Sequence, residues 1–325
     1  MVVAPAIAIL VSTFTVLSNG KFPQQSQSVC IRERSEFSGC FSLADTLSTR
    51  ETTSITTSPK GHLLASSYGQ TIQLWDLTTG KLLTTLKGHS DWVSAITLSP
   101  DAQTIASSSL DRTIRLWSLR MGKVLHTYNA GRMTVLAFSP DGRIVAGGSR
   151  HRFWLDGQPG SSGVQFWDLK TGKQLRSLGS GQIASLAFSP NGRILATGSK
   201  YTQVWDLKTR KLLHILNSGE VTSLAFNPDG QTLVTGSSRI KVWHVTTGQL
   251  IHTFNSGSSN LALSPDGQTL AVANGGTIQV WQMVSKRFLG TFRGSWYSNL
   301  WVDFGWNGRL LVSGSSEGIK VWRAQ

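Results

Sequence analysis

The feature that most constrains this chain is a tryptophan that returns at nearly regular intervals, each time directly after an apolar residue. Successive members of the series are 42, 50, 38, 38, 38 and 41 residues apart. The series consists of Trp75, Trp117, Trp167, Trp205, Trp243, Trp281 and Trp322. A period of this length, present seven times, predicts an array of similar supersecondary units that bury their apolar faces against one another.

Each repeat predicts four short strands. Alternating segments such as TIQLW, TIRLW and RIKVW lead up to the tryptophan, and a period of two places alternate residues on one face of a sheet. Turns such as SPDG and NPDG stand upstream in register, where proline fixes φ and glycine accepts a positive φ. Turns such as LTTGK follow the tryptophan and open a further strand. The charged fraction of only 15% and the 33 glycines suit such turns and do not suit a helical bundle.

These units resemble the WD-repeat family. The literal Trp-Asp pair occurs at Trp75-Asp76, Trp167-Asp168 and Trp205-Asp206, and the other four tryptophans are followed by different residues. The resemblance covers about residues 41–325 and implies an all-β fold, a seven-bladed β-propeller of four-stranded antiparallel blades. Membership also implies a buried network in the second blade, formed by His89, a serine within 107–109, Asp111 and Trp117.

The two ends of the repeat array predict how the ring closes. After Trp322 only three residues remain, so the last unit lacks its outermost strand. The segment 42–47 aligns without gaps with the outer strands 173–178 and 211–216. We therefore expect a strand near residues 42–48 to complete the last blade, which removes an unpaired sheet edge. The domain organisation predicted is an N-terminal segment over 1–40 and a propeller over 41–325.

Residues 1–40 leave the compartment open. The apolar stretch 2–17 is too short for a spanning helix and resembles the apolar part of a secretory signal, but the positive charge that normally precedes it is missing. The alternative is that this stretch is an unstructured extension, or that the start codon has been placed upstream of the true one. Cys30 and Cys40 are the only cysteines, and they can form a disulfide in an exported chain or stay reduced in the cytosol. We expect no transmembrane segment in the mature domain and a monomeric propeller.

No catalytic, cofactor or metal site is predicted. The His–Ser–Asp combination of the second blade could suggest nucleophilic catalysis, but the pattern it matches is a structural network that holds a turn. His126, His214 and His252 share a register on the outer strands of three different blades, so they should point apart and not bind one metal. Two cysteines without a paired-histidine partner do not make a structural zinc site. We therefore expect no enzyme activity.

The loops at one end of the strands are the predicted binding surface, because function in this architecture is carried by loops on a rigid scaffold. We call this end the top face, which holds the loops between the second and third strands of each blade and between successive blades. Arginine, tryptophan and tyrosine carry most energy at interfaces. The candidate partner-binding residues are Arg50, Tyr68, Trp92, Arg112, Arg132, Arg150, Arg152, Phe153, Trp154, Lys200, Tyr201, Arg239, Trp296 and Tyr297.

Some of these candidates have plainer explanations. The insertion 150–160 is a basic and aromatic loop that can form a contact patch or fold back on its own blade. Trp92 lies in GHSDWV, a common spelling of the family, so it can serve packing alone. Many lysines and arginines in the turns of the opposite end can be a solvated face.

The function predicted is a non-enzymatic scaffold that presents the top face to a protein or peptide partner. The net charge of +14 supports an alternative, in which basic faces bind an anionic polymer such as nucleic acid or polysaccharide. A nucleic acid partner is the less favoured of the two, because the charges are scattered singly along the sequence and can serve solubility.

Overall fold

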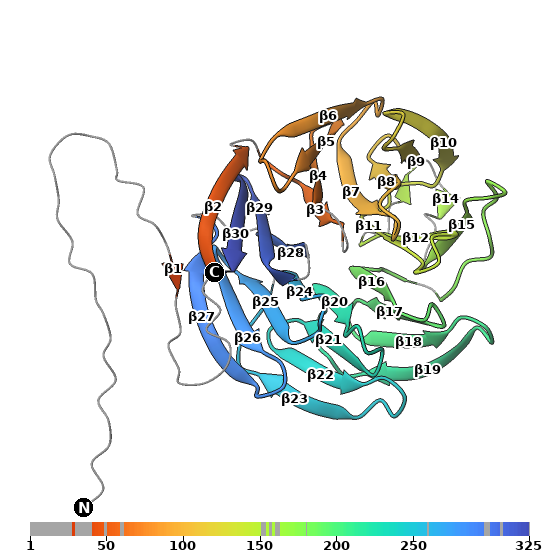
Figure 1. Cartoon of the computed structure of the whole chain (residues 1–325). Coiled ribbons are helices and arrows are strands. Elements are labelled where there is room, and N and C mark those ends of the chain that lie inside the picture. Colours follow the sequence, from red (N-terminus) through yellow and green to blue (C-terminus); the bar gives the residue numbers. More distant parts are fainter. Residues whose placement is uncertain are drawn as a thin grey trace, which may run out of the picture.

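The structure is a computed structural model, which describes residues 28–29, 41–48, 51–58, 62–150, 154–155, 158–159, 163–179, 181–258, 260–295, 300–305 and 308–324. The strands form eight antiparallel sheets, and seven of them are arranged as blades of a ring (Figure 1). The predicted seven-bladed β-propeller is therefore confirmed. Among the described residues no helix is long and apolar enough to cross a membrane.

We number the blades in chain order and name their strands a to d from the centre outwards. Blade 1 consists of β3 (Ser54–Thr57), β4 (Leu63–Tyr68), β5 (Thr71–Asp76) and β6 (Leu82–Lys87). Blade 2 consists of β7 (Val93–Leu98), β8 (Thr104–Ser109), β9 (Thr113–Ser118) and β10 (Lys123–Asn129). Blade 4 consists of β16 (Ser185–Phe188), β17 (Ile194–Gly198), β18 (Thr202–Asp206) and β19 (Lys211–Leu216).

The next two blades have the same plan. Blade 5 consists of β20 (Ser223–Phe226), β21 (Thr232–Gly236), β22 (Ile240–His244) and β23 (Leu250–Phe254). Blade 6 consists of β24 (Asn260–Leu263), β25 (Thr269–Asn274), β26 (Thr277–Gln282) and β27 (Arg287–Arg293). Each of the seven repeat tryptophans lies on strand c of its blade, as the alternation before it predicts.

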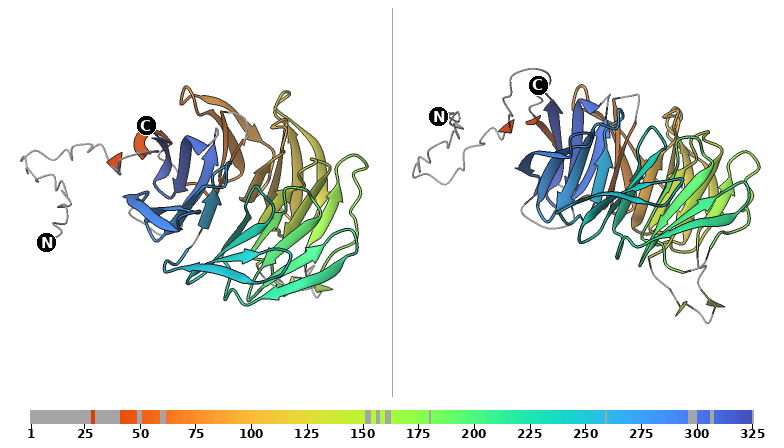
Figure 2. Two further views of the ribbon diagram at one scale, coloured as in Figure 1. Left: turned by 60° about the horizontal axis from the view of Figure 1, so that its bottom comes forward. Right: turned by 90° about the horizontal axis from the view of Figure 1, so that it is seen from below.

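Blade 3 departs from the four-strand pattern. Its regular strands are β11 (Val135–Phe138), β12 (Ile144–Gly148) and β15 (Gln165–Asp168). The expected outer strand is reduced to two isolated bridges, Val164 with Leu178 and Trp167 with Gln174. The insertion before β15 forms a small hairpin of β13 (Trp154–Leu155) and β14 (Gln158–Pro159), which stands clear of the ring in Figure 2.

Blade 7 closes the ring with a strand from the other end of the sequence, as predicted. Its strands are β28 (Trp301–Gly305), β29 (Leu310–Ser315) and β30 (Gly318–Ala324), and β2 (Phe41–Ser48) pairs antiparallel with β30. The register joins Phe41 to Ala324 and Ser48 to Ile319. A further strand, β1 (Ser28–Val29), pairs with β2, so two residues of the predicted N-terminal segment extend this sheet.

A buried carboxylate reinforces this closure at the inner strands. Asp303 of β28 accepts hydrogen bonds from the backbone N–H of Thr57 (2.8 Å) and from its hydroxyl (3.0 Å), which joins blade 7 to blade 1. Burial raises the pKa of Asp303 to about 6, against the effect of these hydrogen bonds. The sequence contains no signal for this contact, because an aspartate on one strand does not indicate a threonine 246 residues away.

The core lies between the blades. In one cluster Ile72 and Leu74 of blade 1 pack with Val93, Ile105 and Trp117 of blade 2, and a corresponding cluster joins blades 7 and 1. Burial between two sheets is what the alternating pattern of each strand requires. Trp117, Trp167 and Trp322 are 1%, 1% and 0% exposed, and Trp75 and Trp243 are also buried. Trp205 and Trp281 are partly buried and pack against the core clusters.

Candidate functional site

The top face is built from tight turns between strands b and c and from the loops that join successive blades. In blade 2 these two loops are held together by backbone hydrogen bonds, from Leu110 N–H to the Trp92 carbonyl (2.9 Å) and from Ala130 N–H to the Arg112 carbonyl (3.0 Å). Arg112 has φ of 70°, a left-handed conformation that the tight turn imposes. The turn thereby places the Arg112 side chain on the surface of this face.

A chain of hydrogen bonds beneath these loops fixes their position. The indole N–H of Trp117 donates to the hydroxyl of Ser107 (2.8 Å), and this hydroxyl lies 2.7 Å from His89 Nε2. His89 Nδ1 lies 2.7 Å from Asp111 Oδ2. Asp111 Oδ1 accepts further bonds from the hydroxyl of Thr113 (2.6 Å) and from its backbone N–H (2.9 Å). The structure thus brings the predicted residues His89, Asp111 and Trp117 together, with Ser107 as the serine.

The pKa shifts agree with one direction of donation along this chain. Burial lowers the pKa of His89, so that its ring is neutral at pH 7, with Nδ1–H donating to Asp111 and Nε2 accepting from Ser107. The pKa of Asp111 is lowered to about 2, because bonds from Thr113 and His89 outweigh the opposing effect of its burial. Every polar group of the chain then has at least one hydrogen-bond partner, and the serine hydroxyl donates to a buried imidazole beneath the loop. This arrangement holds a turn.

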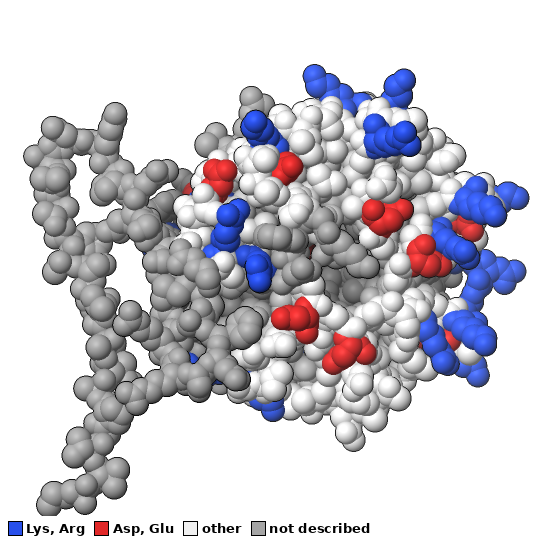
Figure 3. Space-filling model, viewed as in Figure 1, with Lys and Arg blue, Asp and Glu red and all other residues white. Residues whose placement is uncertain are grey.

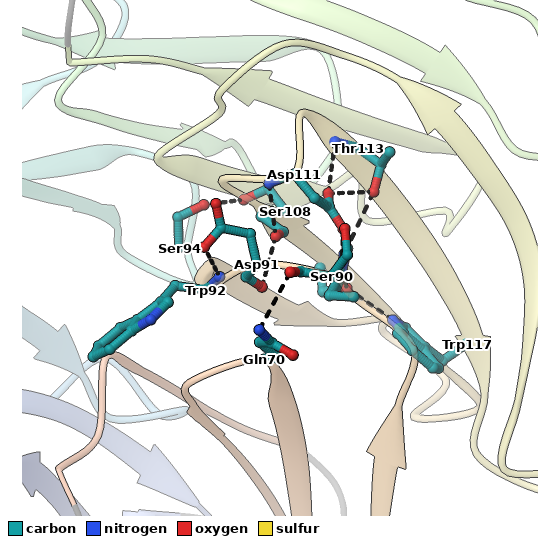
Figure 4. A network of polar contacts seen from close by, with 12 residues as sticks. Gln70, Ser90, Asp91, Trp92, Ser94, Ser108, Asp111, Thr113 and Trp117 are labelled. Atoms are coloured by element: carbon teal, nitrogen blue, oxygen red, sulfur yellow. Dashed lines mark hydrogen bonds and ion pairs between the residues drawn. The ribbon is translucent and has the colours of Figure 1, made fainter.

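Trp92 has a well-defined position among the predicted residues of the top face. Its backbone N–H donates to Asp91 Oδ1 (2.7 Å), and the following residue, Val93, donates to the carbonyl of Gly69 in blade 1 (2.7 Å). The Trp92 side chain is nevertheless 50% exposed. Figure 4 shows its ring pointing away from the network, on the opposite side from Trp117. A fixed backbone with a half-exposed indole is typical of a residue that binds a partner at low entropic cost.

Other predicted residues surround the same face. Tyr68 ends β4 and is 38% exposed, and Tyr201 is 44% exposed with the Lys200 Nζ 5.6 Å from its ring centroid. Arg150 follows β12 and donates from Nη2 to the carbonyl of Thr222 (3.2 Å), which joins blade 3 to blade 5 past blade 4. Arg132 is half-buried between blades 2 and 3, and Arg239 is exposed between β21 and β22.

The remaining predicted residues are not placed in this way. Arg50, Arg152, Phe153, Trp296 and Tyr297 lie outside the described residues, as do Cys30 and Cys40. Trp154 lies on β13, and only its backbone is described.

Sequence reasoning missed a regular partner of the repeat tryptophans. Five of their indole N–H groups donate to a serine or threonine on strand b, always two residues beyond the one that pairs with the tryptophan. These hydroxyls belong to Ser66, Ser107, Thr197, Thr235 and Ser313. The sequence signal for these contacts is a serine or threonine at the same position of strand b in each of the five blades.

The opposite end of the strands contains a cavity of about 620 Å³ between blades 2 and 3, lined by residues that include Asp101 and Asp141. These carboxylates accept hydrogen bonds from Ser99 and Ser139 of their own turns, which lower their pKa values. They therefore stabilise turns and are not poised as an acid and a base. Among the described residues no three histidines, cysteines or acids are grouped to hold a metal ion.

Comparison with known proteins supports the repeat assignment. The model of the WD domain, G-beta repeat, matches residues 44–76, 80–118 and 248–282. The model of the Eukaryotic translation initiation factor eIF2A matches residues 149–255, from the end of β12 to β23. Three matched repeats within a seven-bladed ring define a β-propeller of the WD type. The matched repeats and the seven blades support the assignment of this chain as a WD-repeat protein.

Similarity to curated proteins is confined to short segments. The chain is 48% identical over 48 residues to the nuclear distribution protein PAC1 of Coccidioides posadasii (strain C735), covering 14% of this chain and 10% of that protein. It is 50% identical over 42 residues to the protein of the same name from Fusarium vanettenii, covering 13% and 9%. The chain thus spans about a tenth of the length of these relatives. Their similarity extends over about one repeat.

Proposed function

We propose that this protein is a non-enzymatic scaffold that binds a protein or peptide partner on the top face of the propeller. WD-repeat propellers are generally scaffolds for protein interaction, and the family assignment supports this class. The observation that carries the proposal is Trp92, whose backbone is fixed from two blades while its indole stays half exposed.

The charges of the top face favour an acidic partner segment. Arg112, Lys200 and Arg239 are exposed on the turns of three different blades. The Arg150 guanidinium extends from blade 3 and donates a hydrogen bond to the Thr222 carbonyl of blade 5. Among the acids of this face, Asp91 binds the Trp92 N–H and Glu317 lies 3.7 Å from Lys320. A partner that presents carboxylates around one large apolar side chain would match both the cations and the indole.

Affinity capture with the full chain as bait tests this proposal. One variant bait carries Trp92→Ala, Arg112→Asn and Arg239→Ala, where asparagine tolerates the left-handed conformation at residue 112. A matched control carries Lys81→Gln, Lys286→Asn and Arg287→Gln, which lie at the other end of the strands. We expect a protein that the unchanged bait and the control capture and the top-face variant loses.

Two results would overturn the proposal. Equal capture by all three baits would mean that the top face is not the binding surface. Capture that disappears with nuclease would mean that a nucleic acid carries the association.

A further inference from the structure

A set of exposed cations lies on one side of the ring. Ten lysines and arginines lie on the outer strands and on the a–b and c–d turns of blades 2, 3 and 4. We call this set the cationic arc, and its members are Arg120, Lys123, Arg143, Lys170, Lys173, Arg176, Arg193, Lys208, Arg210 and Lys211. Figure 3 shows lysine and arginine along the margin of the ring where β10, β15, β18 and β19 lie, with acids nearer its centre. The corresponding region of blade 5, residues 244–254, contains no lysine or arginine.

The carboxylates of the same turns are occupied by their own backbone and hydroxyl groups. Asp168 Oδ1 accepts hydrogen bonds from the N–H and hydroxyl of Thr171, and Asp206 Oδ1 accepts the same pair from Thr209. Arg193 pairs with Asp206 at 2.9 Å. Within the described part of the chain, no other cation of the arc lies within 4.0 Å of a carboxylate oxygen. All ten cationic side chains are exposed, and nine of them form no ion pair with the described residues. Besides the hydrogen bonds within the turns, Arg143 and Lys170 lower the pKa of the neighbouring carboxyls of Asp141 and Asp168.

The shape of the arc selects among anionic partners. The arc follows the curved outer margin of the ring, a path that a flexible chain can track (Figures 1 and 3). Its exposed apolar side chains are aliphatic, such as Met121, Leu213 and Ile215, and blade 5 exposes similar residues, Leu250 and Ile251, without the cations. The aliphatic residues therefore belong to the repeat and do not mark a membrane contact, and they give bases no aromatic surface to stack on.

We propose that the cationic arc binds the phosphate backbone of a flexible single-stranded nucleic acid without reading its bases. The arc uses the other end of the strands from Trp92, so this inference does not depend on the top-face proposal. Binding through phosphates releases condensed cations, and its affinity falls steeply with salt. With about five phosphates neutralised, the affinity should fall about 100-fold between about 50 and about 200 mM salt.

Fluorescence anisotropy with a labelled oligouridylate and a labelled oligoadenylate of about 20 nucleotides tests this proposal on the full chain. The arc variant carries Lys208→Gln, Arg210→Asn and Lys211→Gln, where Arg210 has φ of 58° and asparagine preserves the turn. The control variant carries Lys81→Gln, Lys286→Asn and Arg287→Gln, which removes the same charge elsewhere and includes Lys286, also at φ of 58°.

We expect the two oligonucleotides to bind alike, and the arc variant to lose at least about tenfold in affinity with a salt slope shallower by about 2. The control variant should lose less than about twofold, and both variants should keep the melting temperature of the unchanged protein. Equal losses in the two variants would show that net charge and not the arc is responsible, and would overturn the proposal. Binding of heparin or of phosphatidylserine vesicles without binding of either oligonucleotide would overturn it as well.

Discussion

Blades 2 and 6 hold the same repeat tryptophan in two different ways, and its side chain is buried in blade 2 and half-buried in blade 6. In blade 2 the indole N–H of Trp117 begins a hydrogen-bond chain that ends at Asp111. In blade 6 the corresponding position of strand b is Val272, and the buried Trp281 N–H has no partner among the described residues. Two rings pack on Trp281 instead, Phe254 at 5.0 Å and Phe288 at 4.9 Å between centroids. The difference teaches that the tryptophan is present for its volume, and that the polar network is an addition that fixes one pair of loops.

The largest loss of stability is expected when the repeat tryptophan is removed from either blade. We expect Trp117→Ala and Trp281→Ala each to lower the free energy of unfolding by about 3–5 kcal/mol, because each leaves a cavity between two sheets. Urea denaturation of the two variants measures it. A loss at residue 117 that exceeds the loss at 281 by more than about 3 kcal/mol would show that the network, and not the volume of the ring, dominates.

The next largest loss of stability should follow from removing the hydrogen-bond network, which is present in blade 2 and not in blade 6. Ser107→Ala leaves the Trp117 N–H and His89 Nε2 unpartnered in a buried place, and we expect a loss of about 1–3 kcal/mol in the free energy of unfolding. The matched change in blade 6 is Val272→Ala, which removes apolar volume and no hydrogen bond. Hydrogen exchange at the amides of residues 88–92 should quicken in the first variant and stay unchanged in the second. Unchanged exchange in both would mean that the network does not hold the loop of Trp92.

The network also makes the stability of blade 2 depend on pH. The pKa of Asp111 in the folded protein, about 2, lies below its ordinary value of 3.8, and the pKa of His89 is lowered from 6.5. Both groups therefore contribute stability that is present at neutral pH and is lost on acidification, His89 first below pH 6.5 and Asp111 below about pH 4.

Between pH 5 and pH 2 the free energy of unfolding of the unchanged protein should fall. We expect this fall to be smaller by up to about 2 kcal/mol in the Asp111→Asn variant. Comparing chemical denaturation of this variant with that of the unchanged protein isolates the effect. The contribution of Asp303 has the opposite sign, since its pKa is raised to about 6 and its stability is lost as pH rises, and it cancels in the comparison. Parallel profiles for the two proteins would contradict the assignment to Asp111.

The smallest effect is expected from a substitution that gives blade 6 the hydroxyl partner of the tryptophan that blade 2 already has. Val272→Thr places a hydroxyl where Thr235 accepts from Trp243 in blade 5 (2.9 Å), so it should give the Trp281 N–H a partner. We expect a gain of up to about 1 kcal/mol, measured as the free energy of unfolding. Thr235→Val is the reciprocal change and should cost a similar amount. If both substitutions destabilise equally, packing around Val272 outweighs the new hydrogen bond.

Most of the fold could be predicted because its signals are local. The alternation before each tryptophan and the proline-glycine turns recur every forty residues or so, and each is a short-range property of the backbone. The completion of blade 7 by residues 41–48 also followed from the sequence, because a missing outer strand at one end matched an unassigned segment at the other. The weakened outer strand of blade 3 did not follow, since residues 173–178 have the same pattern as the outer strands that form.

The candidate site was predicted as a set of residue types on one set of loops. Tyr68, Trp92 and Arg112 lie on those loops as the repeat register requires. The register could not tell that Trp92 points out while Trp117 points in, because both tryptophans follow a family spelling.

The sequence by itself determined the number of blades, the place of each tryptophan on strand c and the way the ring closes. Only the tertiary structure decided which side chains from distant repeats meet. It joined Thr57 to Asp303 and Arg150 to Thr222, and it gathered singly scattered lysines and arginines into one arc over blades 2 to 4. The physical reason is that strand periodicity is a local property of the chain, whereas contacts and charge patches form between segments that only the closed ring brings together.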